Sequence, residues 1–160
     1  MSQHPRFVNW DELPYEQWRE GDRFGSSEQN LGRAAGSARI GLRRETVPSG
    51  RQSGPQHAHM AEEELFIVLK GRGSVLHGKE SISVRSGDIL SYPAGTGLAH
   101  AFVADAGEEL EFLSIGERNP DDVVIYPNSG KVLVNSLKDS AGEQGIVGRL
   151  TETGYWDGEH

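Results

Sequence analysis

From about residue 36 onward, short apolar segments alternate with breaks that are rich in glycine, proline, serine and aspartate or asparagine. Each segment has the length of a strand, and each break supplies residues that tight turns need. This layout is typical of an antiparallel sandwich or barrel, so the sequence predicts an all-β fold. The predicted strands are 38–47, 64–69, 73–77, 81–84, 88–92, 99–103 and 109–115, and a hairpin is predicted from 123–126 and 131–134.

The two ends of the chain lack this regularity. Residues 1–35 carry scattered aromatic residues among charges, and we interpret them as an arm that packs on its own barrel or on a second subunit. Within this arm, Asp11 is a candidate cap for a short helix over 12–19. Residues 137–160 are polar and glycine-rich, and we interpret them as a tail that packs on the barrel. The remaining residues, 36–136, form the predicted barrel.

The composition agrees with a single domain of short strands. A chain of 160 residues fits one ordinary domain, and its 21 glycines suit strands that are joined by tight turns. No cysteine is present, so any tightly held metal ion must use imidazole and carboxylate ligands.

Charge and hydropathy argue against nucleic acid and membrane partners. The chain has 16 basic and 24 acidic residues, and its formal charge of −8 repels nucleic acids and anionic lipids. No apolar run approaches the roughly 18 residues of a membrane span, and the first residues lack the pattern of a signal peptide. We therefore expect a cytoplasmic protein with no nucleic acid or membrane partner.

The strongest sign of chemistry is the sequence His57-Ala58-His59, followed by the acidic run 62–64. In an extended strand, residues two positions apart point to the same face, so both imidazoles can approach one ion. A carboxylate from the acidic run and His100 from a neighbouring strand would complete four ligands. Such a set suits zinc, manganese, iron, nickel or cobalt and can leave positions open to water or substrate.

The remaining histidines, His4, His77 and His160, are interpreted as surface or hydrogen-bonded residues. No glycine-rich phosphate-binding motif with a following helix occurs, so no nucleotide cofactor is expected.

The stretch 50–71 resembles the first motif of the cupin family. In that motif a His-x-His pair is followed after four residues by a ligand glutamate, and after six more by a turn glycine. The spacing from His59 to Glu64 and from Glu64 to Gly71 fits, whereas the initial glycine lies one residue too far from the histidine pair. The resemblance implies that Glu64 is the ligand carboxylate, with Glu62 as the fallback.

The stretch 87–104 is similar to the second cupin motif, with its first glycine, Pro93, Gly95 and His100 in the expected order. It departs from the standard form in two ways. The gap between Gly95 and His100 is two residues longer, and Ala104 replaces an asparagine that often follows the histidine. We interpret the longer gap as a turn variant.

The resemblance covers about residues 38–116, and the chain also looks like the stand-alone bacterial cupins that are often labelled conserved-barrel (cupin type-2) proteins or sugar-phosphate isomerases. It implies a double-stranded β-helix, which is the jelly-roll barrel of cupins, and a homodimer, because cupins commonly pair. It also implies one divalent ion (zinc, manganese, iron or nickel) that is held by His57, His59, Glu64 and His100.

A ligand pocket is expected at the mouth of the barrel, with Phe66, Tyr92, Phe102 and Arg43 as candidate lining residues. An inward arginine would bind a carboxylate or a phosphate. We expect a metal-dependent enzyme for a small polar metabolite (a sugar, sugar phosphate or organic acid) with isomerase, dioxygenase or lyase chemistry. The alternative is a non-catalytic cupin that binds or senses a small molecule. An acid–base or anion-binding group near the open coordination positions would favour an enzyme.

Overall fold

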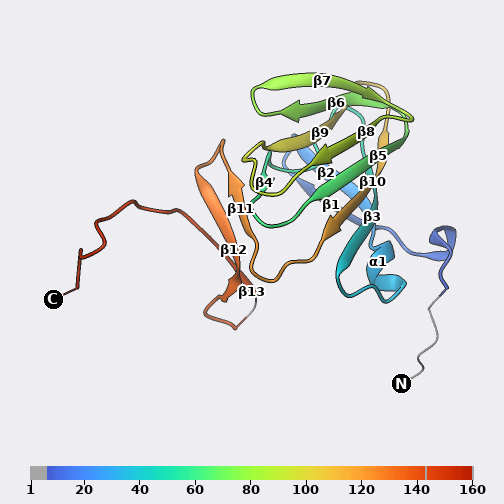
Figure 1. Ribbon diagram of the computed structural model, residues 1–160. Coiled ribbons are helices and arrows are strands. Elements are labelled where there is room, and N and C mark those ends of the chain that lie inside the picture. Colours follow the sequence, from blue (N-terminus) through green and yellow to red (C-terminus); the bar gives the residue numbers. More distant parts are fainter. Residues whose placement is uncertain (1–6, 143, 160) are drawn as a thin grey trace.

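A computed structural model describes residues 7–142 and 144–159, and its regular structure is almost entirely β-sheet (Figure 1). Every pairing between adjacent strands is antiparallel in this part of the chain. The largest sheet contains, in spatial order, β1 (Glu16–Glu20), β2 (Phe24–Gln29), β3 (Ile40–Val47), β10 (Leu110–Glu117), β5 (Glu64–Lys70) and β8 (Ile89–Tyr92). A second sheet contains β7 (Glu80–Arg85), β6 (Arg72–His77) and β9 (His100–Ala104). A third contains β13 (Gln144–Gly148), β12 (Lys131–Lys138), β11 (Val123–Tyr126) and β4 (Ala58–His59).

The predicted all-β fold is confirmed. Each strand predicted between residues 38 and 126 is present with its ends shifted by at most two residues, and the predicted hairpin is formed by β11 and β12. β12 continues to Lys138 because it pairs with β13 on its other side. No helix in the described residues is long and apolar enough to cross a membrane.

The helix predicted over residues 12–19 is wrong. A single 3-10 turn, η1 (Trp10–Glu12), forms instead, and the side chain of Asn9 rather than Asp11 accepts the capping hydrogen bond. The chain then continues into β1, which pairs along its whole length with β2, while β2 pairs with β3. The short helix α1 (Leu31–Ala34) follows, with Asn30 as its N-cap. Much of the predicted arm is therefore an extension of the largest sheet.

The end of the chain also differs from the prediction of a packed tail. The first part of that region completes β12 and forms β13, but residues 149–159 are all exposed. Tyr155 and Trp156 remain 86% and 74% exposed. Figure 1 shows this segment leading away from the sheets.

The hydrophobic core lies between the largest sheet and the sheet of β6, β7 and β9. Alternate residues of β3, β5 and β10 point to it, as the period of a strand requires. The rings of Phe102 and Phe112 stack at 4.3 Å, and Phe66 packs against Phe102 at 4.9 Å. Buried aliphatic and aromatic residues complete this cluster, including Val47, Val68, Val75, Val84 and Leu110.

Further along β3, β5 and β10, the same inward positions become small or polar. Gly41 and Arg43 on β3, Glu64 on β5, and Ser114 and Gly116 on β10 all line one cavity. The apolar end of the barrel therefore supplies the packing, and the polar end supplies a candidate site.

Candidate metal centre

The four predicted ligands come from the strands around this polar end. His57 and His100 face each other across an isolated bridge, in which the backbone N–H of each donates to the carbonyl of the other at 3.1 and 2.8 Å. His59 is held one step further on, because β4 pairs with β11. Glu64 begins β5 and His100 begins β9. Three strands and the bridge thus bring residues from separate parts of the chain together.

The side chains of these four residues converge. His100 Nε2 lies 3.0 Å and His59 Nε2 lies 3.5 Å from the same oxygen, Glu64 Oε2. The ring of His57 lies 5.2 Å from that of His59 and 5.1 Å from that of His100. One ligand atom each from His57, His59 and Glu64 fall within 4.8 Å of one another. These three residues can therefore approach one ion, and His100, which falls outside this 4.8 Å group, adjoins it through its contact with Glu64.

Buried atoms without hydrogen-bond partners support this interpretation. Glu64 Oε2 and both ring nitrogens of His100 are buried and make no hydrogen bond to a described residue. The 3.0 Å contact between Glu64 and His100 brings the atoms close without the angles of a hydrogen bond. Buried polar atoms that lack partners cost free energy, so their convergence requires an explanation. A cation bound between them supplies one, and the donor set fits zinc, manganese, iron or nickel.

Two of the imidazoles are oriented by hydrogen bonds at their other nitrogen. His57 Nδ1 lies 2.9 Å from the carbonyl of Pro55, and His59 Nδ1 lies 2.6 Å from Asp122 Oδ2. A protonated Nδ1 that donates in these contacts leaves the Nε2 lone pair free for the cluster. A carboxylate behind a ligand histidine is a recurring feature of metal sites, since it fixes the ring and raises its basicity.

Asp122 is a site residue that the sequence reasoning missed. It is fully buried, and its second oxygen accepts a hydrogen bond from the backbone N–H of Ala61 at 2.7 Å. It lies 63 positions from His59, after the last strand of the cupin-like region. Nothing in the sequence distinguishes it from its neighbour Asp121.

The charge states of two ligands suit cation binding. Burial alone would raise the pKa of Glu64, but contact with His100 and attraction to the histidine rings hold that pKa below its ordinary value. Burial lowers the pKa of His57, and the neighbouring ring of His100 lowers it further. An ionised carboxylate and a neutral imidazole are the forms that bind a metal ion.

Glu62, the fallback ligand, lies on the other side of His59. Its Oε2 is 3.6 Å from His59 Nδ1, and its Oε1 accepts a hydrogen bond from the backbone N–H of Asn119 at 2.6 Å. His59, Glu62 and Asp122 form a second group whose ligand atoms lie within 4.8 Å of one another. This group uses the nitrogen of His59 that faces away from Glu64. An ion in this second group would bind His59 through Nδ1, whereas an ion in the first cluster would bind the same ring through Nε2. The two groups are therefore alternative sites that share His59.

The aromatic residues predicted to line the pocket lie underneath the cluster. Phe66, Tyr92 and Phe102 are buried members of the core and are absent from the lining of the cavity, because their inward positions fall at the apolar end of the barrel. The ring of Tyr92 stacks on His100 at 3.9 Å, and its hydroxyl lies 3.1 Å from Nδ1 of His77. Burial raises the pKa of Tyr92 to about 12, so this phenol stays neutral. His77 is thus hydrogen-bonded, while His4 and His160 lie outside the described residues.

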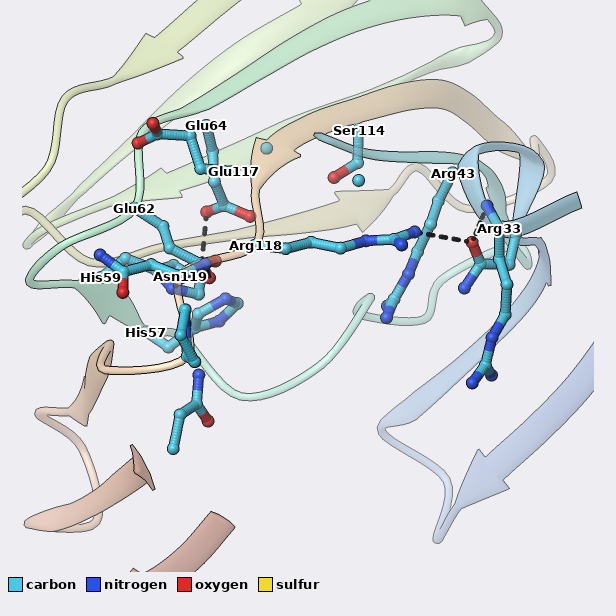
Figure 2. Close-up of a pocket in the computed structure, with 15 residues that line it drawn as sticks. Arg33, Arg43, His57, His59, Glu62, Glu64, Ser114, Glu117, Arg118 and Asn119 are labelled. Carbon is cyan, nitrogen blue, oxygen red and sulfur yellow. Dashed lines mark hydrogen bonds and ion pairs between the residues drawn. The ribbon is translucent and has the colours of Figure 1, made fainter. Parts of the chain in front are cut away.

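The cavity beside the cluster has a volume of about 710 Å³ and is lined mostly by polar residues. Arg43 lines it, as the sequence predicted, together with Arg33 and Arg118. Figure 2 shows His57 and His59 on one side of this cavity and the side chains of Arg33 and Arg43 on the other. The structure thus combines a cluster of residues that could hold a metal ion with basic groups in one open space.

Comparison with known families agrees with this fold. Residues 43–116 match the family model for the Cupin domain. This range of the chain contains His57, His59, Glu64 and His100. The fold is that of a jelly-roll barrel, and its structural neighbours are cupin proteins. Residues 43–116 are therefore a cupin domain, and the fold of the chain is a cupin fold. No curated protein matches it significantly.

Three solved structures illustrate the similarity. A sugar phosphate isomerase of the cupin superfamily from Silicibacter pomeroyi is 23% identical with a TM-score of 0.77, over 90% of this chain and 92% of that one. A protein from Acidithiobacillus ferrooxidans, provisionally described as a sugar phosphate isomerase, is 25% identical with a TM-score of 0.75, over 92% and 97% of the two chains. The polyketide cyclase RemF from Streptomyces resistomycificus is 22% identical with a TM-score of 0.59, over 70% and 78%.

Proposed function

We propose that the protein is a metal-dependent enzyme that acts on a small polar metabolite, with one divalent ion held by His57, His59, Glu64 and His100. The observation that carries this proposal is the convergence of buried donor atoms without hydrogen-bond partners beside an open cavity. An ion held there would supply Lewis-acid or redox chemistry. Three imidazoles and one carboxylate leave room for further ligands on zinc, manganese, iron or nickel.

The reaction class that we favour is isomerisation. Dioxygenase and lyase chemistry are the alternative reaction classes. The similarity to the Silicibacter pomeroyi protein supports this choice of class. The cavity also holds ionisable groups besides the cluster, including Arg43, Glu62 and Glu117. Such groups can bind an anion or move a proton, whereas a binding module needs only apolar walls and a few polar contacts.

The metal centre is tested by elemental analysis of the purified protein and of single histidine variants. We expect about one ion per chain in the natural protein and a large loss of metal in His59→Ala. His77→Ala is the comparison variant, because this residue is hydrogen-bonded to Tyr92 and is not a proposed ligand, although it lies opposite His100 in the pairing of β6 and β9. Both variants should keep their β-sheet signal in circular dichroism, since the core stands apart from the ion. Equal metal content in the two variants would contradict the proposal.

Catalysis is tested with the metal-loaded protein against panels of sugar phosphates, free sugars and organic acids. We expect turnover of a member of one panel, and no turnover of it by His59→Ala. If ligands raise the melting temperature but none is converted, the protein is a binding or sensing cupin instead. Melting temperature and turnover therefore separate the two functions.

We also propose that the protein forms a homodimer. The outer strands of its sheets leave hydrogen-bonding edges uncovered within one chain, and such edges are commonly covered by a partner. Sedimentation should give a dimer, and deletion of residues 1–35 should shift it toward monomer or aggregate, because β3 would lose its neighbour β2. A dimer that is unchanged by this deletion would show that the N-terminal region plays no part in assembly.

A further inference from the structure

We propose that Arg118 and Arg33 form an anion-binding subsite, which takes a phosphate or carboxylate group of the substrate at the side of the cavity opposite the metal-binding cluster. This inference rests on the proposed function in one respect, since it takes the cavity to be the substrate site. It adds the chemical class of the substrate: a small metabolite with an anionic group at one end and oxygen atoms that can reach the ion at the other.

The first observation is that three basic side chains gather at one side of the cavity, opposite the three glutamates that also line it. Arg33, Arg43 and Arg118 line one cavity of a chain whose formal charge is −8. The charge of Arg43 is compensated, because its Nη1 lies 3.3 Å from Glu28 Oε2. Within residues 7–142 and 144–159, neither Arg33 nor Arg118 makes an ion pair with a carboxylate. Two uncompensated guanidinium groups in one cavity favour a bound anion.

The second observation is that Arg118 is held in place before any anion binds. Its Nη1 donates to the carbonyl of Ser37 at 2.8 Å, and its Nη2 donates to Asn30 Oδ1 at 3.4 Å. Figure 2 shows this side chain extended across the cavity toward Arg33 and Arg43. A guanidinium has five N–H groups, so these two bonds leave others for an oxyanion. Fixing the side chain in advance reduces the entropy that binding must remove.

The third observation is that two glycines lie close to this arginine. A Cβ atom added to Gly41 would lie 3.7 Å from Nε of Arg118, and one added to Gly32 would lie 3.4 Å from its Nη2. The Gly32 Cβ would also meet the backbone nitrogen of Leu42 at 2.9 Å. Both distances to Arg118 are ordinary van der Waals contacts, whereas the approach to Leu42 would force a shift of the backbone. The two glycines therefore form a close-packed floor beneath the guanidinium of Arg118.

The distribution of charge sets the orientation of the substrate. Glu62, Glu64 and Glu117 lie at the end of the cavity near His57 and His59, where they repel an anion. The basic groups lie at the opposite side. The volume of about 710 Å³ is within the range of small-molecule sites. A phosphorylated sugar or a hydroxy acid of similar length would place its anion on the arginines and its hydroxyl or carbonyl oxygens toward the cluster.

The test measures anion binding by calorimetry, with inorganic phosphate and succinate as separate probes, in metal-loaded protein and again after metal removal by a chelator. Arg118→Gln and Arg33→Gln remove the proposed contacts. Arg85→Gln removes one positive charge from an exposed position on β7 outside the cavity and is the matched control. We expect the Kd of at least one probe to rise about tenfold or more in Arg118→Gln, as the loss of a charge-assisted contact predicts, and to stay unchanged in Arg85→Gln. The probe that responds more strongly identifies the group as phosphate or carboxylate.

Equal Kd values in Arg118→Gln, Arg33→Gln and Arg85→Gln would overturn the subsite. Loss of anion binding on metal removal would also overturn it, because the anion would then sit on the ion. Metal content measured in the same samples keeps the two proposals apart. A normal metal content with unaltered anion binding in the variants refutes the subsite alone, whereas absence of metal from the natural protein refutes the metal centre alone.

Discussion

Asp122 connects the cluster to the rest of the fold at the scale of single residues. One of its oxygens accepts from Nδ1 of His59 at 2.6 Å, and the other accepts from the backbone of Ala61 at 2.7 Å. The ring of His59 is thus fixed on a buried carboxylate that is itself fixed on the backbone. This arrangement keeps Nε2 directed at Glu64.

We predict that Asp122→Asn lowers metal affinity by about 10- to 100-fold, as is typical when the partner behind a ligand histidine is changed. An amide can still accept a hydrogen bond, but it removes the negative charge that makes the imidazole a stronger ligand. Asp121→Asn is the matched control, because its side chain is exposed. Competition with a fluorescent chelator measures both affinities, and equal values would show that Asp122 does not support a ligand.

Glu45 is a partly buried acid that the sequence pattern did not single out. It occupies an inward position of β3, two residues from Arg43. Burial raises its pKa from 4.5 to about 7, Glu28 and Glu64 contribute to the rise, and Ser26 and Arg43 oppose it. The folded protein therefore takes up a proton at Glu45 more readily than the unfolded chain does.

The sign of this shift gives a prediction of stability against pH. Because the folded pKa is higher, the free energy of unfolding should fall as the pH rises through the window from 4.5 to about 7, by at most about 3 kcal/mol from this group. Glu45→Gln removes the group, so its melting temperature should exceed that of the natural protein at pH 8 and converge with it at pH 4.5. Glu80→Gln, at an exposed position, is the control. Parallel curves for Glu45→Gln and the natural protein would contradict the prediction.

The residues of the site divide into those that local spacing predicts and those that it does not. The motif resemblance picked out His57, His59, Glu64 and His100, which the fold brings together. Asp122 and Arg118 were not predicted, because each acts through the packing of a loop after β10 against distant segments. Such contacts depend on how the strands are arranged in space, and one sequence carries no periodic signal for them.

At the scale of elements, the turn between β5 and β6 depends on Gly71. Its φ is +83°, and an added Cβ would lie 1.8 Å from the carbonyl oxygen of Glu109. Gly87 also has a positive φ, of +93°, but an added Cβ would meet nothing within 4 Å. Gly95 also has a positive φ, so all three of these motif glycines occupy turn positions that other residues rarely adopt.

We predict that Gly71→Ala destabilises the protein by about 1–3 kcal/mol more than Gly87→Ala does. Both variants carry the strain of a side chain at positive φ, so the difference reports the steric clash with Glu109. Urea denaturation of the two variants measures it. Equal losses of stability would show that the turn moves aside to accept the side chain.

β1 shows why one strand of the predicted arm was missed. β1 has one partly buried residue, Trp18, and is exposed at its other four positions, so no alternation of apolar and polar residues marks it. β3, β5 and β10 were predicted because one of their faces packs on the core, which imposes a period of two. β1 thus leaves no periodic signal in the sequence, because backbone pairing to β2 holds it rather than burial of one face.

At the scale of the whole molecule, the interior of the barrel is apolar at one end and polar at the other. Aromatic and aliphatic residues fill the space between the largest sheet and β6, β7 and β9, and the polar cavity opens at the other end of β3, β5 and β10. The central barrel was predicted from the sequence. The boundaries at residues 35 and 136 coincide with no break in the sheets, because β1 and β2 extend the largest sheet and β12 runs on to Lys138.

The most direct test of the metal centre is a crystal structure of the metal-loaded protein with anomalous diffraction data collected at the absorption edge of its ion. The proposal predicts one strong anomalous peak per chain, within ligand distance of His57, His59, Glu64 and His100. A peak between His59, Glu62 and Asp122 would assign the ion to the alternative cluster and contradict the proposed ligand set. A chain that has been shown to contain metal, but gives no peak at the first cluster, would contradict it equally.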